Sequence, residues 1–180
     1  MENKTFEIVS VQSGIEWIGR KVTGSHNGTI DVTKGELILK DGKLAAGTVV
    51  VDARSIKILD ITDPATNAQF AGHLASDDFF SSQKFPEATL EIISVKGNHV
   101  DANLTIRGIA QRIGFDAELH TSGNLVTASA KLVVDRTKYD MKFRSGNFFQ
   151  NLGDSLIYND FELNVSVTAK AEKKAVSVLA

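Results

Sequence analysis

The sequence predicts an all-β fold built from about eight to ten short antiparallel strands. Apolar and polar residues alternate along several segments, which is typical of strands that bury one face. Glycine-containing turn signals separate these segments and recur roughly every dozen residues. Strands of this length and spacing close into a barrel or stack as a sandwich, so one of these two architectures is expected.

The strand signal is clearest in the second half of the chain. Residues 161–169 alternate between an apolar face and a polar face, and residues 112–120 and 125–134 do the same. Residues 89–95 and 99–108 predict two further strands. Turns are predicted at Asn27-Gly28, Lys34-Gly35, Asp41-Gly42, Gly97-Asn98, Gly108 and Gly123-Asn124.

Small residues fall on several of the predicted inner faces. Ala117, Ala128 and Ala130 face inward on their strands, and Gly19 shares a face with Trp17. Small inward residues leave room inside a barrel, which is expected if the barrel holds a ligand. The alternative is that large neighbours such as Trp17 fill the space.

One segment interrupts the strands and predicts a short helix. Asp63 is a suitable N-cap, and Pro64 follows at the first helical position. The residues expected to pack this helix on the barrel are Ala65, Ala68, Phe70, Ala71 and Leu74. The domain is predicted to run from residue 1 to 171, followed by a short tail from 172 to 180.

Composition excludes several classes of protein. The net charge is −2 and no basic stripe is present, which argues against nucleic-acid binding. Cysteine is absent, and no apolar run approaches the roughly 18 residues that span a bilayer. No signal peptide is predicted at the N-terminus. The chain as it stands is therefore expected in the cytoplasm, or in the periplasm if a signal peptide was removed.

His73, Asp77 and Asp78 are the candidates for catalysis or metal binding. Neighbouring carboxylates rarely serve as an acid/base pair, because their side chains diverge. The favoured interpretation is that Ser76 and the two acids cap a helical turn while His73 tethers the preceding helix. A metal site needs more converging ligands than this segment offers, so no metal is expected. His26, His99 and His120 lie beside predicted turns and are expected in solvent.

Phenylalanines cluster in two irregular segments instead of in the strands. Phe79, Phe80 and Phe85 form one group, and Phe143, Phe148 and Phe149 form the other. These rings either plug the ends of a filled barrel or gate a cavity, and the residues alone leave both open. Arg107 and Arg136 near strand ends are possible anchors for a polar head group. The alternative for Arg136 is a salt bridge with Asp52 or Asp135.

Four blocks of sequence resemble the YceI family of lipocalin-like, polyisoprenoid-binding proteins. They are "SGIEWIGRKVTGSHNGTI" from Ser13, "GHLASDDFFSSQKFPEATLEI" from Gly72, "ANLTIRGIAQRIGFD" from Ala102 and "VVDRTKYDMKF" from Val133. The second block is the most specific. Two departures stand out: many relatives have an Arg-Asp pair before the His-Leu, where this chain reads "NAQFAGHL", and Gln12-Ser13 replaces a common His-Ser pair.

The resemblance implies an extended antiparallel barrel of about eight strands with a short helical insertion. It also implies an elongated apolar cavity for a polyisoprenoid, a quinone or another long-chain lipid, with no required cofactor. Trp17, Leu74, Phe79, Phe80 and Phe85 fall in matching blocks and are expected to line or cap this cavity. The rings expected there by proximity alone are Phe143, Phe148 and Phe149, and the possible polar anchors are His73, Arg107 and Arg136.

The favoured function is a non-enzymatic carrier of a long-chain lipid, and a homodimer is possible by resemblance. Two alternatives remain open at this stage. One is a protein-interaction module with a filled core that binds through a strand edge. The other is a hydrolase or isomerase that uses His73, Asp77 and Asp78, which requires a strongly shifted pKa in a polar cleft.

Overall fold

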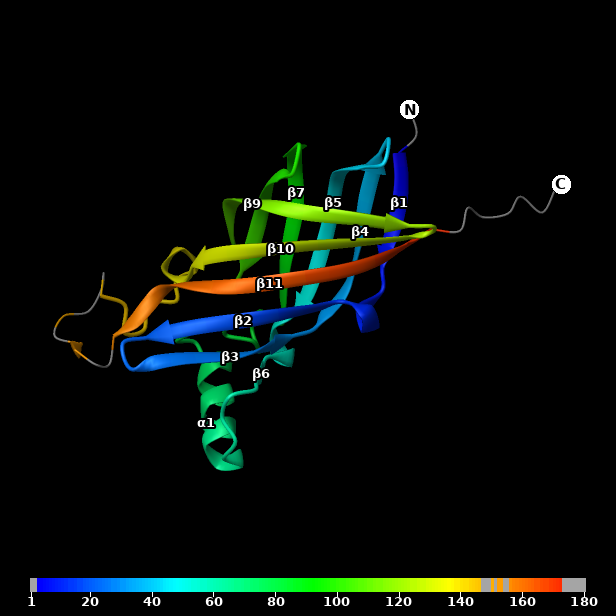
Figure 1. Ribbon diagram of the computed structural model, residues 1–180. Coiled ribbons are helices and arrows are strands. Elements are labelled where there is room, and N and C mark those ends of the chain that lie inside the picture. The colour runs from blue at the N-terminus through cyan, green and yellow to red at the C-terminus, as the bar shows by residue number, and fades with distance from the viewer. Residues whose placement is uncertain (1–2, 147–149, 151, 154–155, 173–180) are drawn as a thin grey trace.

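The alternating segments of the sequence form the strands of a closed barrel (Figure 1). The computed structural model describes residues 3–146, 150, 152–153 and 156–172. Within these residues the sheet has eleven strands and the elements are β1 (Asn3–Ile8), β2 (Gly14–Lys21), β3 (Gly24–Ile30), β4 (Val32–Lys40), β5 (Lys43–Asp52), β6 (Lys57–Ile58), α1 (Pro64–Ala75), β7 (Glu87–Lys96), β8 (His99–Ile106), β9 (Ile109–Ser122), β10 (Leu125–Asp135) and β11 (Ile157–Ala171).

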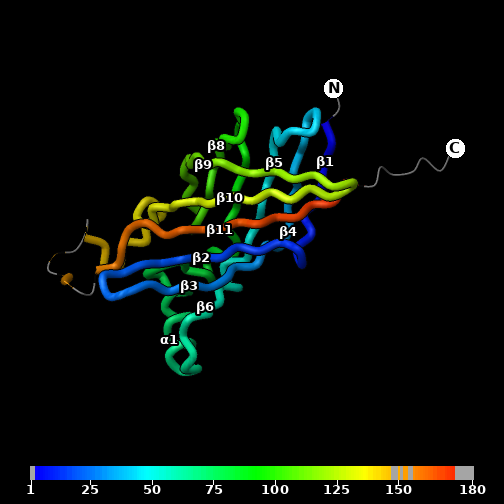
Figure 2. Tube along the Cα trace, viewed as in Figure 1, coloured from blue at the N-terminus to red at the C-terminus, as the bar shows by residue number. Residues whose placement is uncertain are grey.

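Eight antiparallel strands close the barrel, as the sequence predicted. They follow the order β1-β4-β5-β7-β8-β9-β10-β11, and β1 then pairs with the end of β11. The first part of β11 pairs instead with β2, so the sheet continues past the barrel through β2, β3 and β6 (Figure 2). This extension forms a wall beside the barrel, and α1 packs near it.

The helix begins where the sequence predicts and is attached by its second half. The Asp63 carboxylate accepts a hydrogen bond from the backbone N–H of Thr66, which caps α1. Leu74 is buried and Phe70 and Ala71 pack on the core. Ala65 and Ala68 are exposed, contrary to the prediction. The first turns are held instead by the Asn67 amide, which donates to two backbone carbonyls of the segment before the helix.

Four predicted turns are confirmed and two are wrong. Turns lie at Asp41-Gly42, Gly97-Asn98, Arg107-Gly108 and Gly123-Asn124. Gly28 and Gly35, by contrast, lie within β3 and β4. A Cβ on Gly28 would lie 1.7 Å from the Lys57 carbonyl oxygen, and one on Gly35 would lie 2.1 Å from that of Thr48. Both glycines therefore permit close packing within the sheet.

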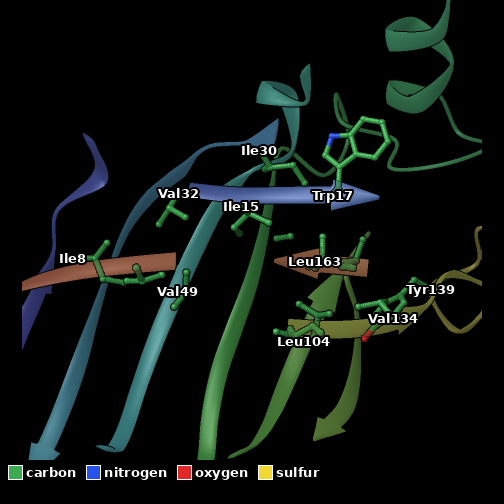
Figure 3. Packing of buried hydrophobic residues seen from close by; sticks show 14 of the residues in the cluster. Ile8, Ile15, Trp17, Ile30, Val32, Val49, Leu104, Val134, Tyr139 and Leu163 are labelled. Carbon is green, nitrogen blue, oxygen red and sulfur yellow. The ribbon is translucent and has the colours of Figure 1, made fainter. Parts of the chain in front are cut away.

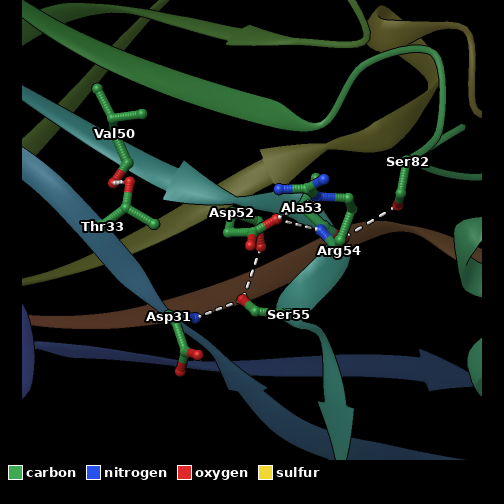
Figure 4. A network of polar contacts seen from close by, with 8 residues as sticks. All are labelled: Asp31, Thr33, Val50, Asp52, Ala53, Arg54, Ser55 and Ser82. Carbon is green, nitrogen blue, oxygen red and sulfur yellow. Dashed lines mark hydrogen bonds and ion pairs between the residues drawn. The ribbon is translucent and has the colours of Figure 1, made fainter.

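The connection after β5 is held by a network of short polar contacts (Figure 4). The Ser55 hydroxyl donates to the Asp52 carbonyl oxygen at 2.6 Å and accepts from the backbone N–H of Asp31 at 2.8 Å. The Ser82 hydroxyl donates to the Ala53 carbonyl oxygen at 3.0 Å. Asp52 forms its ion pair with Arg54, so the alternative pairing of Asp52 with Arg136 is wrong.

The buried core runs along the inside of the barrel and its extension. Ile15, Trp17 and Leu163 belong to this core, and the indole of Trp17 extends from β2 toward the helix (Figure 3). A smaller cluster at Ile92, Val100 and Ala102 fills another part of the barrel. Within the described residues, no helix has the length and apolar character that a bilayer crossing requires.

Candidate ligand-binding cavity

An apolar cavity lies between the strands of the barrel and the wall formed by β2, β3 and α1. Its volume is about 170 Å³, and nearly all of its surface is hydrocarbon. Apolar cavities of this order accept apolar guests. Apart from charged residues at one end, its walls include Ile15, Trp17, Gly19, Ile30, Val49, Val51, Ile56, Phe70, Leu74, Phe79, Phe80, Ala88, Leu90, Leu104, Ile106, Leu132, Met141, Ile157, Phe161, Leu163 and Val165.

Trp17 is fixed in the cavity wall by its neighbours. Its indole N–H donates to the Lys57 carbonyl oxygen at 3.2 Å. The ring lies over Gly28, where a Cβ would approach it to 2.7 Å. Gly19 lies two residues beyond Trp17 on the same face of β2. A Cβ placed on Gly19 would have one neighbour within 4 Å, the Trp17 ring at 3.9 Å. Gly19 therefore leaves open space beside a rigid aromatic surface.

Of the small residues predicted to leave room inside the barrel, Gly19 borders the cavity and the three alanines do not. Gly19 lines the cavity, as its place beside Trp17 suggested. Ala117, Ala128 and Ala130 face inward but are not among the lining residues. Side chains of the barrel core occupy their part of the interior, so the cavity lies toward α1.

Four phenylalanines line the cavity, and two of them were predicted from the sequence. Phe79 is 8% exposed, and Phe80 packs edge-on against Phe161 with 6.2 Å between ring centroids. Phe70 on α1 and Phe161 on β11 were not among the predicted site residues. The alternation of β11 already placed Phe161 inward, so this signal was available in the sequence.

The exposed end of the cavity lies beside the register shift between β2 and β11. Its exposed lining residues, Lys21, Tyr158 and Asp160, all lie at this end. Ile157 stands opposite Lys21 in the strand pairing. His26 also lines this end, with its ring 4.8 Å from that of Phe70. The mouth therefore carries the polar side chains of an otherwise apolar site.

His26 was expected in a solvated turn and lies instead on β3. Its Nδ1 is 2.8 Å from the Asp60 carboxylate, which also accepts the backbone N–H of Asn27. Burial alone would raise the pKa of Asp60, but the hydrogen bonds from Asn27 and His26 outweigh it and lower this pKa. The wrong turn assignment at Asn27-Gly28 explains why this contact was missed.

Arg136 lies in the cavity wall and is bound by backbone carbonyls. It donates to the carbonyl oxygens of Met141, Ile157 and Tyr158 at 2.6, 3.0 and 3.0 Å. It is 4% exposed, and its guanidinium carbon is 5.8 Å from the centre of the Phe79 ring. Burial lowers the pKa of Arg136 to about 10, partly offset by nearby Asp135. Neither predicted salt bridge, to Asp52 or to Asp135, forms.

The other predicted site residues lie away from the lining. Phe85 packs against Gly108, and Phe143 packs on Phe79 and His73 behind the cavity wall. Arg107 occupies a tight turn with φ of 54° and donates to the Asp140 carbonyl oxygen at 2.8 Å. Phe148 and Phe149 lie outside the described residues.

His73, Asp77 and Asp78 do not converge on a polar cleft. His73 Nε2 is 3.0 Å from Asp78, whereas Asp77 accepts from the Ser81 hydroxyl at 2.6 Å and faces Lys84. The Ser81 hydrogen bond and then Lys84 lower the pKa of Asp77.

Ser76 ends α1, and its hydroxyl donates to the His73 carbonyl oxygen. The same hydroxyl accepts the backbone N–H of Asp78 at 3.3 Å, so Ser76 caps the segment that follows as predicted, although residues 77–80 form a turn and not a helix. Among the described residues, no three His, Asp or Glu side chains group as metal ligands.

Several solved structures share this fold at low sequence identity. BcnA of Burkholderia cenocepacia matches with a TM-score of 0.71 and 17% identity, over 91% of this chain and 99% of that chain. A polyisoprenoid-binding domain from Saccharophagus degradans matches with a TM-score of 0.65 and 15% identity, over 93% and 98%. The YceI protein of Campylobacter jejuni matches with a TM-score of 0.56 and 20% identity, over 73% and 75%.

Sequence comparison identifies the family. The UPF0312 protein SAB2563 of Staphylococcus aureus is 34% identical over 82 residues, which cover 39% of this chain. The match spans 46% of that relative, about half its length. The model of the YceI-like domain matches residues 6–169, nearly the whole described barrel. The chain therefore belongs to the family of YceI-like domains.

Proposed function

We propose that this protein carries or sequesters a long apolar amphiphile in the cavity beneath α1, without catalysis. A polyisoprenoid, an isoprenoid quinone and a fatty-acid-like lipid all belong to this ligand class. The observation that carries the proposal is the cavity itself, whose walls are hydrocarbon from Ile15 and Trp17 to Phe80 and Phe161.

The physical basis of binding is burial of the chain. Each methylene that leaves water for an apolar surface contributes about 0.8 kcal/mol. The site is largely preformed, because Trp17 is fixed by its hydrogen bond and Phe80 by Phe161. A preformed site loses little conformational entropy when the ligand enters. The polyisoprenoid-binding domain of Saccharophagus degradans, which has this fold, supports the same ligand class.

The two alternatives receive less support. A filled-core interaction module has no use for an apolar cavity lined by Gly19 and four phenylalanines. An enzyme acting through His73, Asp77 and Asp78 needs those groups to face one substrate, whereas Asp77 turns toward Ser81 and Asp78 toward His73.

Native mass spectrometry of the purified protein tests the proposal, with solvent extraction to identify anything released. A discrete added mass that extracts as an isoprenoid, a quinone or a fatty-acid derivative is the expected result. Protein that arrives bare is next titrated with such lipids while the fluorescence of Trp17, the single tryptophan, is followed. A bare mass together with unchanged fluorescence would refute the carrier function. The same spectra report whether the protein is a homodimer.

A further inference from the structure

The inner face of the β2–β3 hairpin changes from apolar to cationic toward the mouth of the cavity. Side chains on this face alternate along β2, so Lys21 follows Gly19 and Trp17. Lys21 is exposed and takes part in none of the ion pairs found among the described residues. A ligand whose tail lies against Trp17 therefore meets the ammonium group of Lys21 at the mouth, where this group has no ion-pair partner among the described residues.

Arg136 adds a second cation to the same end of the cavity. It donates to the Ile157 carbonyl oxygen, and Ile157 is paired with Lys21. Three of its five guanidinium N–H groups have carbonyl acceptors, and no described carboxylate lies within ion-pair distance. Asp135 accepts hydrogen bonds from Thr137 instead. A buried cation without a carboxylate partner is stabilised by any anion that reaches it.

Of the described acids around the mouth, Glu162 is paired with Arg20 at 2.9 Å and with Lys131 at 3.6 Å. Asp60 lies 2.8 Å from His26 Nδ1 and is not among the lining residues. Asp160 is the one acid on the cavity lining, and it forms none of the ion pairs among the described residues. Among the described residues that line the cavity, the charges without an ion pair are therefore two cations, Lys21 and Arg136, and one acid, Asp160.

We propose that the cavity selects amphiphiles with an oxyanion head group, a carboxylate or a phosphate, held at the mouth between Lys21 and Arg136. The inference rests on the proposed lipid-carrier function and narrows its ligand class. A neutral head group of the same length gains hydrogen bonds at the mouth but leaves both cations without an anionic partner. Hydrogen bonds that include a charged group are about twice as strong as neutral ones.

Matched ligand pairs test the proposal through Trp17 fluorescence. Oleic acid is compared with oleyl alcohol, and geranylgeranyl phosphate with geranylgeraniol, each below its aggregation concentration at neutral pH. The anionic member of a pair is expected to bind about tenfold more tightly, an advantage that shrinks at high salt. A preference confined to one pair supports the proposal and identifies the head group as carboxylate or phosphate.

Two substitutions at exposed positions change the charge at the mouth and leave the core unchanged. Lys21→Gln is expected to weaken binding of the anionic ligand about threefold, and Asp160→Asn to strengthen it by a similar factor. Both variants should change the affinity for the alcohols by less than they change the affinity for the anionic ligands.

Equal affinities for both members of each pair, or variants that shift acid and alcohol alike, would overturn the head-group proposal and leave the carrier function standing. Absence of binding by all four ligands would overturn both.

Discussion

Leucine in place of Gly19 should block ligand binding while the barrel stays folded. Gly19 lines the cavity, and an ideal Cβ there has one neighbour within 4 Å, the Trp17 ring at 3.9 Å. That distance is an ordinary van der Waals contact, and Gly19 does not have the positive φ at which a side chain would be strained. The leucine side chain therefore enters the space that we assign to the ligand.

The loss of affinity follows from the volume that the new side chain occupies. The four carbons of leucine displace roughly three to four methylenes of a lipid chain, each of which contributes about 0.8 kcal/mol. Binding is then expected to weaken by about 3 kcal/mol, or more than a hundredfold. The free energy of unfolding should stay the same or increase, because the leucine buries apolar surface in an existing cavity.

The matched control is Gly14→Leu, on the opposite face of β2. A Cβ at Gly14 has no atom within 4 Å, and Gly14 is not among the lining residues. Both variants are compared with the parent protein by native mass spectrometry with added lipid and by urea unfolding. Parent-like binding by Gly19→Leu would refute the assignment of this cavity as the site. Equal loss in both variants would show that the effect does not act through the cavity.

Three further predictions concern stability. Arg136→Met leaves three backbone carbonyls without their donor and should lower the free energy of unfolding by about 3 kcal/mol in urea titrations; parent-like stability would contradict this role. Gly28→Ala should destabilise the protein strongly and shift the Trp17 emission, whereas Gly72→Ala on the open side of α1 should stabilise it by about 0.5–1 kcal/mol. Asp60→Asn should be less stable than the parent at neutral pH, because the folded state lowers the pKa of Asp60 below its usual 3.8. That difference should shrink as the pH falls below 3.8 and disappear below the lowered pKa of the folded state, where the carboxylate is protonated in both states; a pH-independent difference would refute this reasoning.

The strands and the helix start were predictable because their signals are local. Alternation along residues 161–169 reports which face of one strand is buried, and Asp63-Pro64 reports a helix start within a few residues. Gly28 was misassigned because its reason lies elsewhere in the chain. An Asn-Gly pair is typical of a hairpin turn, but here the glycine accommodates the Lys57 carbonyl and the Trp17 ring.

The lining of the cavity was also only partly predictable from the sequence, because the contacts that decide it lie elsewhere in the chain. Trp17, Leu74, Phe79 and Phe80 were expected at the cavity and lie on its wall. Phe85 was expected there too, but its ring packs on Gly108, where a Cβ would lie 3.1 Å from it, and it is not among the lining residues. Which side of an irregular segment faces inward depends on its turns, and no periodicity in the sequence records them.

Phe79 and Phe80 show why the sequence left two interpretations of its aromatic residues open. Phe79 packs edge-on against His73 and Phe143, with ring centroids 5.0 and 5.8 Å away, and lies under the Arg136 guanidinium. Phe80 is less buried and meets Phe161 across the cavity wall. Phe79 thus joins an aromatic cluster with His73 and Phe143 and also lines the cavity, and Phe80 lines the cavity beside Phe161. Filling and lining are therefore not exclusive, since one ring can do both.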